Sequence, residues 1–199
     1  MKIILFGLFI MGLTFLILNI QANRIATKIA AAPTKVTSIS LPTPEKHDYT
    51  ISYGSKDAPH TLVSFFDMGC THCATFFREK FPIIKKAWIE NGQLRMIFKP
   101  YPIHQETLFF MSCCEGLTDI QKVILFETIM ETENANADHI CAAMEILHRP
   151  FKLPTSSVLK EALMLTTTHE FTALPMMFFD DWPLSDEDQD NLIHFLQEI

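Results

Sequence analysis

The sequence lacks an excess of positive charge, and it lacks internal repeats and low-complexity runs. Its 16 Lys and Arg residues stand against 23 Asp and Glu residues, which gives a formal net charge of −7. Because binding to phosphates requires a basic surface, this charge balance argues against a nucleic-acid partner. The 199 residues are 48% hydrophobic, which is enough for one domain with a real core, or for one domain that carries an insertion.

The sequence contains one Cys-x-x-Cys motif, at Cys70 and Cys73, and lacks a second one, although the chain has five cysteines. Structural zinc takes four ligands, usually from two paired motifs, and the adjacent Cys113 and Cys114 have the wrong spacing. Several histidines are scattered along the chain, and isolated histidines are most often surface or hydrogen-bonded residues. They include His104, His139, His148 and His169. We therefore expect no metal and no other cofactor.

One long apolar run lies at the N-terminus, where residues 3–18 are interrupted only by two glycines and one threonine. Its length falls between the roughly 7–15 residues of a signal-peptide core and the about 20 residues of a membrane span. We expect residues 1–22 to be a cleaved signal or an uncleaved anchor, with residues 3–20 then tethering the chain to the inner membrane. Residues 23–46 contain three prolines and are predicted to be a linker. Both outcomes predict export to the periplasm.

The segment that follows the linker, residues 47–103, predicts strand, helix and strand. A short apolar run, Thr61–Met68, is typical of a buried strand. Residues 70–90 have helical spacing, with Pro82 expected to kink the helix. Residues 93–103 alternate as a second strand would, and the order implies a parallel crossover. Core positions are expected for Phe65, Phe66, Phe76, Phe77, Phe178 and Phe179.

The rest of the chain predicts a helical domain, residues 104–168, inserted ahead of a last segment, residues 169–199. Helical patterns fill the insertion, with breaks near Gly116, at residues 134–136 and at residues 150–154. The last segment predicts strand, tight turn, strand and a helix that begins near Asp186. The inner face of that helix would carry Leu192, Ile193, Phe195, Leu196 and Ile199. The fold class is therefore α/β with a helical insertion.

The motif Cys70-Thr71-His72-Cys73 lies where the first strand ends and the helix begins. A thiolate at a helix N-terminus faces unpaired N–H groups, which lower its pKa below the ~8.5 of a free thiol, and protonated His72 would add a positive charge. One helical turn brings Cys73 back beside Cys70. A low thiol pKa makes the disulfide a strong oxidant and Cys70 a good leaving group. We expect Cys70 to be the nucleophile and Cys73 the resolving thiol.

Three stretches of the sequence carry a resemblance to a known family. They are "FFDMGCTHCATFFREKFP", "RMIFKPYPI" and "TALPMMFFDDWPL", and together they resemble the DsbA family of thiol:disulfide oxidoreductases over residues 49–199. The resemblance implies a thioredoxin-like fold with an inserted all-helical domain. It also implies that Leu174–Pro175 is a cis peptide facing the sulfurs, where Leu174 and Thr71 would contact an extended substrate chain.

Two positions depart from the family pattern. Thr71 stands where the best-known members have proline, which should tune the redox potential without abolishing the chemistry. Ser64 stands where relatives usually carry a buried acid that handles the proton of the resolving thiol. Asp67 matches a carboxylate of some members, or it is a solvated turn residue. Either Met176 or Met177, which follow the presumed cis proline, is expected to line the substrate surface.

The three cysteines of the helical insertion have two alternative interpretations. Some members of the DsbA family hold a second, non-catalytic disulfide there, which would join Cys141 to Cys114 or to Cys113 and leave one thiol free. Alternatively, all three are small buried apolar residues, a common state of free cysteine. With an odd number of cysteines in an exported chain, pairing within the chain leaves one thiol over, or one in an intermolecular bond.

Together these patterns predict an exported thiol:disulfide oxidoreductase that donates its Cys70–Cys73 disulfide to folding proteins through a mixed disulfide. By resemblance, a membrane quinone-linked partner would reoxidise it. The alternatives are a periplasmic reductase or isomerase, or a copper-handling module that uses Cys70, His72 and Cys73. Isomerases of this fold usually dimerise through an extra N-terminal domain, for which residues 23–46 are too short, so we expect a monomer.

Overall fold

The computed structural model of the chain describes residues 49–132, 135–169 and 171–198. The signal or anchor predicted at residues 1–22 and the linker predicted at residues 23–46 lie outside this part of the chain. Within the described residues, every helix is too short or too polar to cross a membrane.

The described strands form one mixed sheet in the order β1-β3-β2-β4-β5. The strands are β1 (Ile51–Tyr53), β2 (His60–Phe66), β3 (Leu94–Pro100), β4 (Met176–Phe179) and β5 (Trp182–Pro183). The central pair, β2 and β3, is parallel, as predicted, and the other pairs are antiparallel. The sequence did not predict β1, since three residues are too few to show an alternation. Parallel pairing brings the carboxyl ends of β2 and β3 to the same edge of the sheet.

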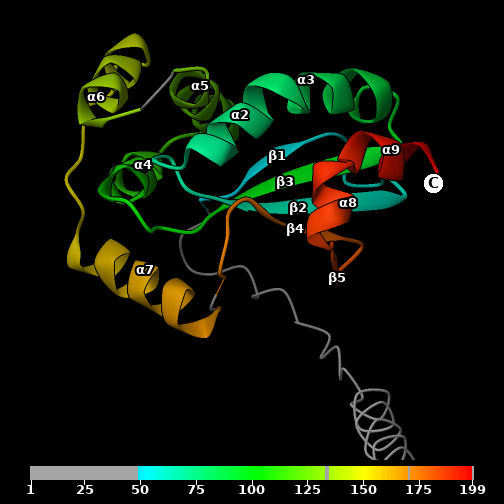
Figure 1. The fold of residues 1–199 in the computed structure, drawn as a ribbon. Helices are drawn as coiled ribbons and strands as arrows, with labels where there is room; N and C mark the ends of the chain where they lie inside the picture. The colour runs from blue at the N-terminus through cyan, green and yellow to red at the C-terminus, as the bar shows by residue number, and fades with distance from the viewer. Residues whose placement is uncertain (1–48, 133–134, 170, 199) are drawn as a thin grey trace, which may run out of the picture. The chain divides into compact units, whose positions relative to one another are not determined.

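Residues 70–90 form consecutive short helices rather than one kinked helix. They are α2 (Thr71–Glu79), α3 (Phe81–Ile84) and the π-helical turn η1 (Lys85–Ile89). The break falls at Lys80, because Pro82 lies in the first turn of α3, where a missing N–H leaves no hydrogen bond unmade. Gly92, with φ of 73°, ends η1 as the sequence predicted, since a left-handed residue there is easiest for glycine. In Figure 1, α2 and α3 run along one side of the sheet.

The helices that the structure describes between β3 and β4 gather at one end of the sheet (Figure 1). They are α4 (Gln105–Cys114), α5 (Asp119–Met130), α6 (Ala137–Ile146) and α7 (Ser156–Thr168). The predicted breaks are confirmed: Gly116 has φ of 81°, and Asn136 and Thr155 cap the helices that follow the other two breaks. These side-chain caps satisfy N–H groups that have no partner within the helix.

The end of the chain forms the predicted turn and a helix that is split in two. Asp180 and Asp181 both have positive φ, 45° and 70°, which makes the tight turn between β4 and β5. The last helix divides into α8 (Asp186–Asp190) and α9 (Leu192–Gln197). The backbone of Asn191, at φ −101° and ψ 26°, leaves the helical region between them. Leu192 and Leu196 are buried as predicted, and Ile193 and Phe195 are partly buried; Ile199 lies outside the described residues.

An aromatic core joins the sheet to the helices on the side of α2. Its centre is Phe98, 1% exposed in β3, whose ring lies 5.0–6.5 Å from six other aromatic rings. Those rings belong to Tyr53, Phe66, Phe76, Phe77, Phe81 and Phe126. The opposite face of β2 is also covered, through Val63 and Phe65. Five of the six phenylalanines predicted for the core are buried, and Phe179 is partly buried.

We predict that Phe98→Ala lowers the free energy of unfolding by about 3–5 kcal/mol, because it opens a cavity among packed rings. Urea unfolding followed by circular dichroism measures the change. Ile120→Ala, at a position that is 74% exposed, is the matched control and should change the free energy by less than about 0.5 kcal/mol. Equal effects of the two substitutions would contradict the position of the core.

Candidate active site

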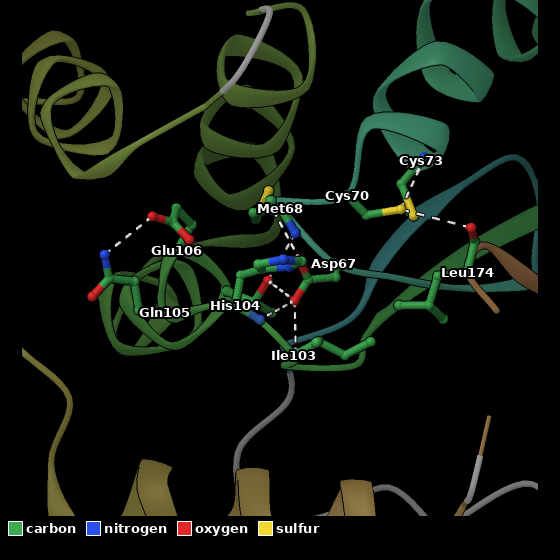
Figure 2. A network of polar contacts seen from close by, with 11 residues as sticks. Asp67, Met68, Cys70, Cys73, Ile103, His104, Gln105, Glu106 and Leu174 are labelled. Carbon is green, nitrogen blue, oxygen red and sulfur yellow. Dashed lines mark hydrogen bonds and ion pairs between the residues drawn. The ribbon is translucent and has the colours of Figure 1, made fainter. Parts of the chain in front are cut away.

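Cys70 and Cys73 lie at the N-terminus of α2, with their sulfurs at the edge of the sheet where β2 ends. Cys70 has an extended backbone, at φ −84° and ψ 114°, and is the N-cap residue of α2. Its Sγ accepts a hydrogen bond from the backbone N–H of Cys73 at 3.4 Å, and its thiol donates to the carbonyl of Leu174 at 3.6 Å (Figure 2). Cys70 is partly exposed, whereas Cys73 is only 2% exposed.

The two thiols differ in pKa because one donates to the other. The hydrogen bond from the Cys73 thiol, with the backbone N–H groups of Cys73 and His72, lowers the pKa of Cys70 to about 6, against burial and the charge of Asp67. The pKa of Cys73 is raised, first by the hydrogen bond to Cys70 and then by burial. Near neutral pH the reduced pair therefore holds one proton, on Cys73, and one negative charge, on Cys70.

His72 and Thr71, the middle residues of the motif, are exposed on the first turn of α2. The sequence predicted that the His72 imidazole would stabilise the thiolate. In the structure His72 contributes to the low pKa of Cys70 through its backbone N–H, as any residue at this place in a helix can. The His72 side chain lines a groove next to the cysteine pair, and the stabilisation of the thiolate by its imidazole stays a prediction.

That groove has a volume of about 430 Å³ and lies between α2, α8 and the segment that enters β4. The Leu174–Pro175 peptide in this segment is cis, as the resemblance implied, and Leu174 reaches the Cys70 thiol through its carbonyl. Met176 and Met177 both line the groove. Met176 is partly exposed and Met177 is 1% exposed, so Met176 presents the larger surface to an occupant.

Asp67, three residues before Cys70, is fully buried, so the interpretation as a solvated turn residue is wrong. Its carboxylate accepts hydrogen bonds from three backbone N–H groups, from the His104 ring and from the Thr107 hydroxyl. The backbone donors belong to Gly69, Ile103 and His104. A buried carboxylate requires such partners, because burial of an unpaired ion costs on the order of several kcal/mol.

Ser64, at the position where relatives usually carry an acid, is also fully buried. It lies on β2 between Leu62 and Phe66, on the face that packs against the aromatic core. Its hydroxyl has no hydrogen-bond partner among the described residues. The buried carboxylate of this site is therefore Asp67, at the end of the strand, rather than a residue inside it.

His104 is the residue of this site that the sequence analysis missed. Its Nδ1 lies 2.6 Å from Asp67 Oδ1, and Figure 2 shows its ring beside the loop that carries Asp67 and Cys70. The position could have been found, since His104 follows β3 as Asp67 follows β2. Carboxyl ends of neighbouring parallel strands meet at one edge, where ligand and active sites of α/β proteins concentrate.

Gly69 allows His104 to lie there. A Cβ on Gly69 would be 2.7 Å from Cγ and 2.8 Å from Cβ of His104, closer than carbon atoms can approach. The backbone N–H of Gly69 donates to Asp67. Lack of space, rather than backbone conformation, therefore requires glycine directly before Cys70.

The three cysteines of the helical block are thiols in the structure, as are Cys70 and Cys73. Cys113 and Cys114 are buried at the end of α4, and Cys141 is partly exposed in α6. Burial raises the pKa of Cys113, and the charge of Cys141 adds to the effect. Cys114–Cys141 and Cys113–Cys141 pairing both stay predictions. Within the described residues, no group of three or more acidic, His or Cys side chains could hold a metal ion.

Comparisons with known proteins agree with this geometry. Residues 46–140 match a family model described as "Thioredoxin". A protein of Rickettsia prowazekii named as a candidate protein-disulfide oxidoreductase is 26% identical over 113 residues, which cover 56% of this chain and 39% of that protein. The chain thus matches well under half the length of this relative.

Solved structures establish the fold. BdbD of Bacillus subtilis superimposes with a TM-score of 0.58 at 17% identity, covering 75% of this chain and 92% of BdbD. The catalytic domain of Proteus mirabilis ScsC gives 0.57 at 24% identity, covering 77% and 92%. Wolbachia pipientis alpha-DsbA1 gives 0.58 at 16% identity, covering 79% and 92%. The predicted thioredoxin-like α/β fold is confirmed, and one of the solved structures that share it is a DsbA protein.

We predict that Cys73→Ala raises the pKa of Cys70, because it removes the thiol that donates to the Cys70 sulfur. The pH dependence of Cys70 alkylation by iodoacetamide measures this pKa, with a midpoint near 6 expected before the substitution. Cys141→Ala, in the helical block, should leave the midpoint unchanged. A midpoint that does not move in Cys73→Ala would show that the helix N–H groups alone lower the pKa.

We predict that Gly69→Ala destabilises the protein by about 1–3 kcal/mol, because the new methyl group overlaps the His104 ring. Thermal or urea unfolding measures the loss. In the double variant Gly69→Ala with His104→Gly, the Cβ and Cγ atoms that the new methyl group would meet are both absent, so the combined loss should be smaller than the sum of the two single losses. Strictly additive losses would mean that the ring and the methyl group do not meet.

Proposed function

We propose that this chain, a thioredoxin-fold protein that resembles the DsbA family, is an exported thiol:disulfide oxidoreductase that donates a Cys70–Cys73 disulfide to folding proteins. One observation carries the proposal: the sulfur of Cys70 has a low pKa and lies beside a groove bordered by a cis proline. Stabilising the thiolate favours the reduced pair, which makes the disulfide a strong oxidant.

Oxidation of a substrate proceeds through two exchanges. A substrate thiolate attacks Cys70, the more exposed sulfur; a substrate–Cys70 bond forms, the Cys70–Cys73 bond breaks, and Cys73 takes a proton. The second thiolate of the substrate then attacks the substrate sulfur that is bonded to Cys70. The disulfide of the substrate forms, and Cys70 leaves as a thiolate. The low pKa of Cys70 speeds this release, because a thiol of low pKa is the better leaving group.

The groove supports a substrate bound as an extended chain. The segment that carries Leu174 and Pro175 borders the reactive sulfur, and backbone groups on such a segment can pair with a substrate strand, while a pocket takes a side chain. Met176 and Phe76, together with the ring of Pro175, make part of the lining apolar. We infer that an apolar side chain next to the substrate cysteine enters the groove.

The cellular setting of this proposal rests on the N-terminal sequence. The apolar run at residues 3–18 supports export, by cleavage or by anchoring, to a compartment where disulfides persist. The substrates would then be reduced exported proteins that are still folding. A membrane quinone-linked protein would return the electrons from the reduced pair and so regenerate the disulfide.

We predict that the Cys70–Cys73 pair is more oxidising than thioredoxin, whose potential is about −270 mV. Equilibration of the full chain with glutathione buffers, followed by mass spectrometry of the alkylated thiols, measures the potential. Cys141→Ala serves as the control and should give the same value. A potential at or below that of thioredoxin would support the reductase alternative and contradict the proposed direction.

A further inference from the structure

The Asp67–His104 pair lies beside the cysteines, yet neither exchange step uses it. Asp67 is buried and His104 is about half exposed, with 51% of its side-chain surface accessible. The two come from the loops that follow β2 and β3, and the His104 ring lies against Gly69, the residue directly before Cys70. Figure 2 shows both side chains between α4 and the cysteine pair.

The hydrogen bonds define which nitrogen of His104 can exchange a proton. Asp67 accepts all five of its hydrogen bonds, three from backbone N–H groups that can only donate. An ionised carboxylate is the form that accepts from every side, so the Nδ1 of His104 carries a hydrogen and donates it. The second ring nitrogen, Nε2, is then the one that gains or loses a proton, and the exposed half of the side chain lets water deliver it.

The charge on His104 depends on the charge on Cys70. The pKa of His104 is raised, first by the hydrogen bond to Asp67, against burial, and further by the charges of Asp67, Glu106 and Cys70. Asp67 and Glu106 are present in both redox states of the protein, whereas the Cys70 thiolate exists only after reduction. Because such coupling is reciprocal, a protonated His104 also favours the Cys70 thiolate.

Reduction of the disulfide by a substrate releases one proton that neither Cys70 nor Cys73 binds. A substrate dithiol brings two protons and two electrons to the disulfide; two S–H bonds break, one S–S bond forms in the substrate, and the Cys70–Cys73 bond breaks. Cys73 takes one proton and Cys70 remains a thiolate, so the second proton is released. Building on the function proposed above, we propose that His104, held by Asp67 against Gly69, binds the proton that substrate oxidation releases. It returns this proton when the disulfide forms again.

The first test compares the titration of His104 in the two redox states of the full chain, with dithiothreitol as the reductant. Nuclear magnetic resonance of the imidazole Cε1–H protons gives each pKa, and the missing signal in His104→Asn assigns His104. We expect a higher pKa in the reduced protein for His104, and the Cε1–H signal of His194, an exposed residue of α9, is the reference for spectral changes unrelated to the site. An identical His104 pKa in both states overturns the proposal.

The second test counts protons. His104→Asn can retain a donor to Asp67 but has no ring to titrate, whereas His104→Ala loses both. The pH dependence of the equilibrium with dithiothreitol gives the number of protons that the protein takes up per disulfide reduced. In the protein without substitutions, we expect this number to exceed one at pH values between the His104 pKa of the oxidised state and that of the reduced state. It should fall to one in both variants over the same pH range. A count that His104→Asn leaves unchanged assigns His104 a structural role only.

These outcomes separate the two proposals. If the pair equilibrates at a reducing potential while the His104 pKa still shifts, the oxidase direction fails and the proton linkage stands. If the potential is oxidising and the His104 pKa is constant, the linkage fails and the function stands. If oxidised protein contains no Cys70–Cys73 disulfide, both proposals are overturned.

Discussion

The capping of α2 by the sulfur of Cys70 is the interaction on which the chemistry of this site depends. A helix begins with N–H groups that have no partner within the helix, and here a sulfur takes the place of the usual oxygen. The same bonds that begin the helix stabilise negative charge on that sulfur. The Cys73 thiol, one turn further, donates to it as well and is the largest cause of the low pKa of Cys70. Local structure and reactivity thus have a single origin.

The parallel pairing of β2 with β3 adds a constraint that the motif does not contain. It places the loop after β3 beside the loop before Cys70, so that His104 can bind Asp67. The Asp67 charge opposes the Cys70 thiolate. A proton on His104, as proposed above, would offset this opposition. Asp67 itself joins the two loops through its hydrogen bonds to Gly69, Ile103 and His104.

Much of the fold followed from local patterns. The helix breaks coincide with a left-handed Gly116 and with the caps Asn136 and Thr155, whose preferences act over a few residues. The strand β2 was predicted from an apolar run in the sequence, and the strand β3 from an alternation of apolar and polar residues. The strand β1, the π-helical turn η1 and the division of the last helix were not predicted, because each depends on packing against neighbours and not on a local pattern.

The sequence by itself determined the Cys70–Cys73 motif, the helix that begins at it and, through a resemblance, the cis proline that borders it. Those features follow from residues that are near in the chain, where the chemistry of a cap or a motif is complete. Only the tertiary structure decided that Asp67 is buried, that Ser64 is not its equivalent, and that His104 belongs to the site. These outcomes depend on which strand ends lie side by side, and Asp67 and His104, which are 37 positions apart in the chain, carry no local signal for that contact.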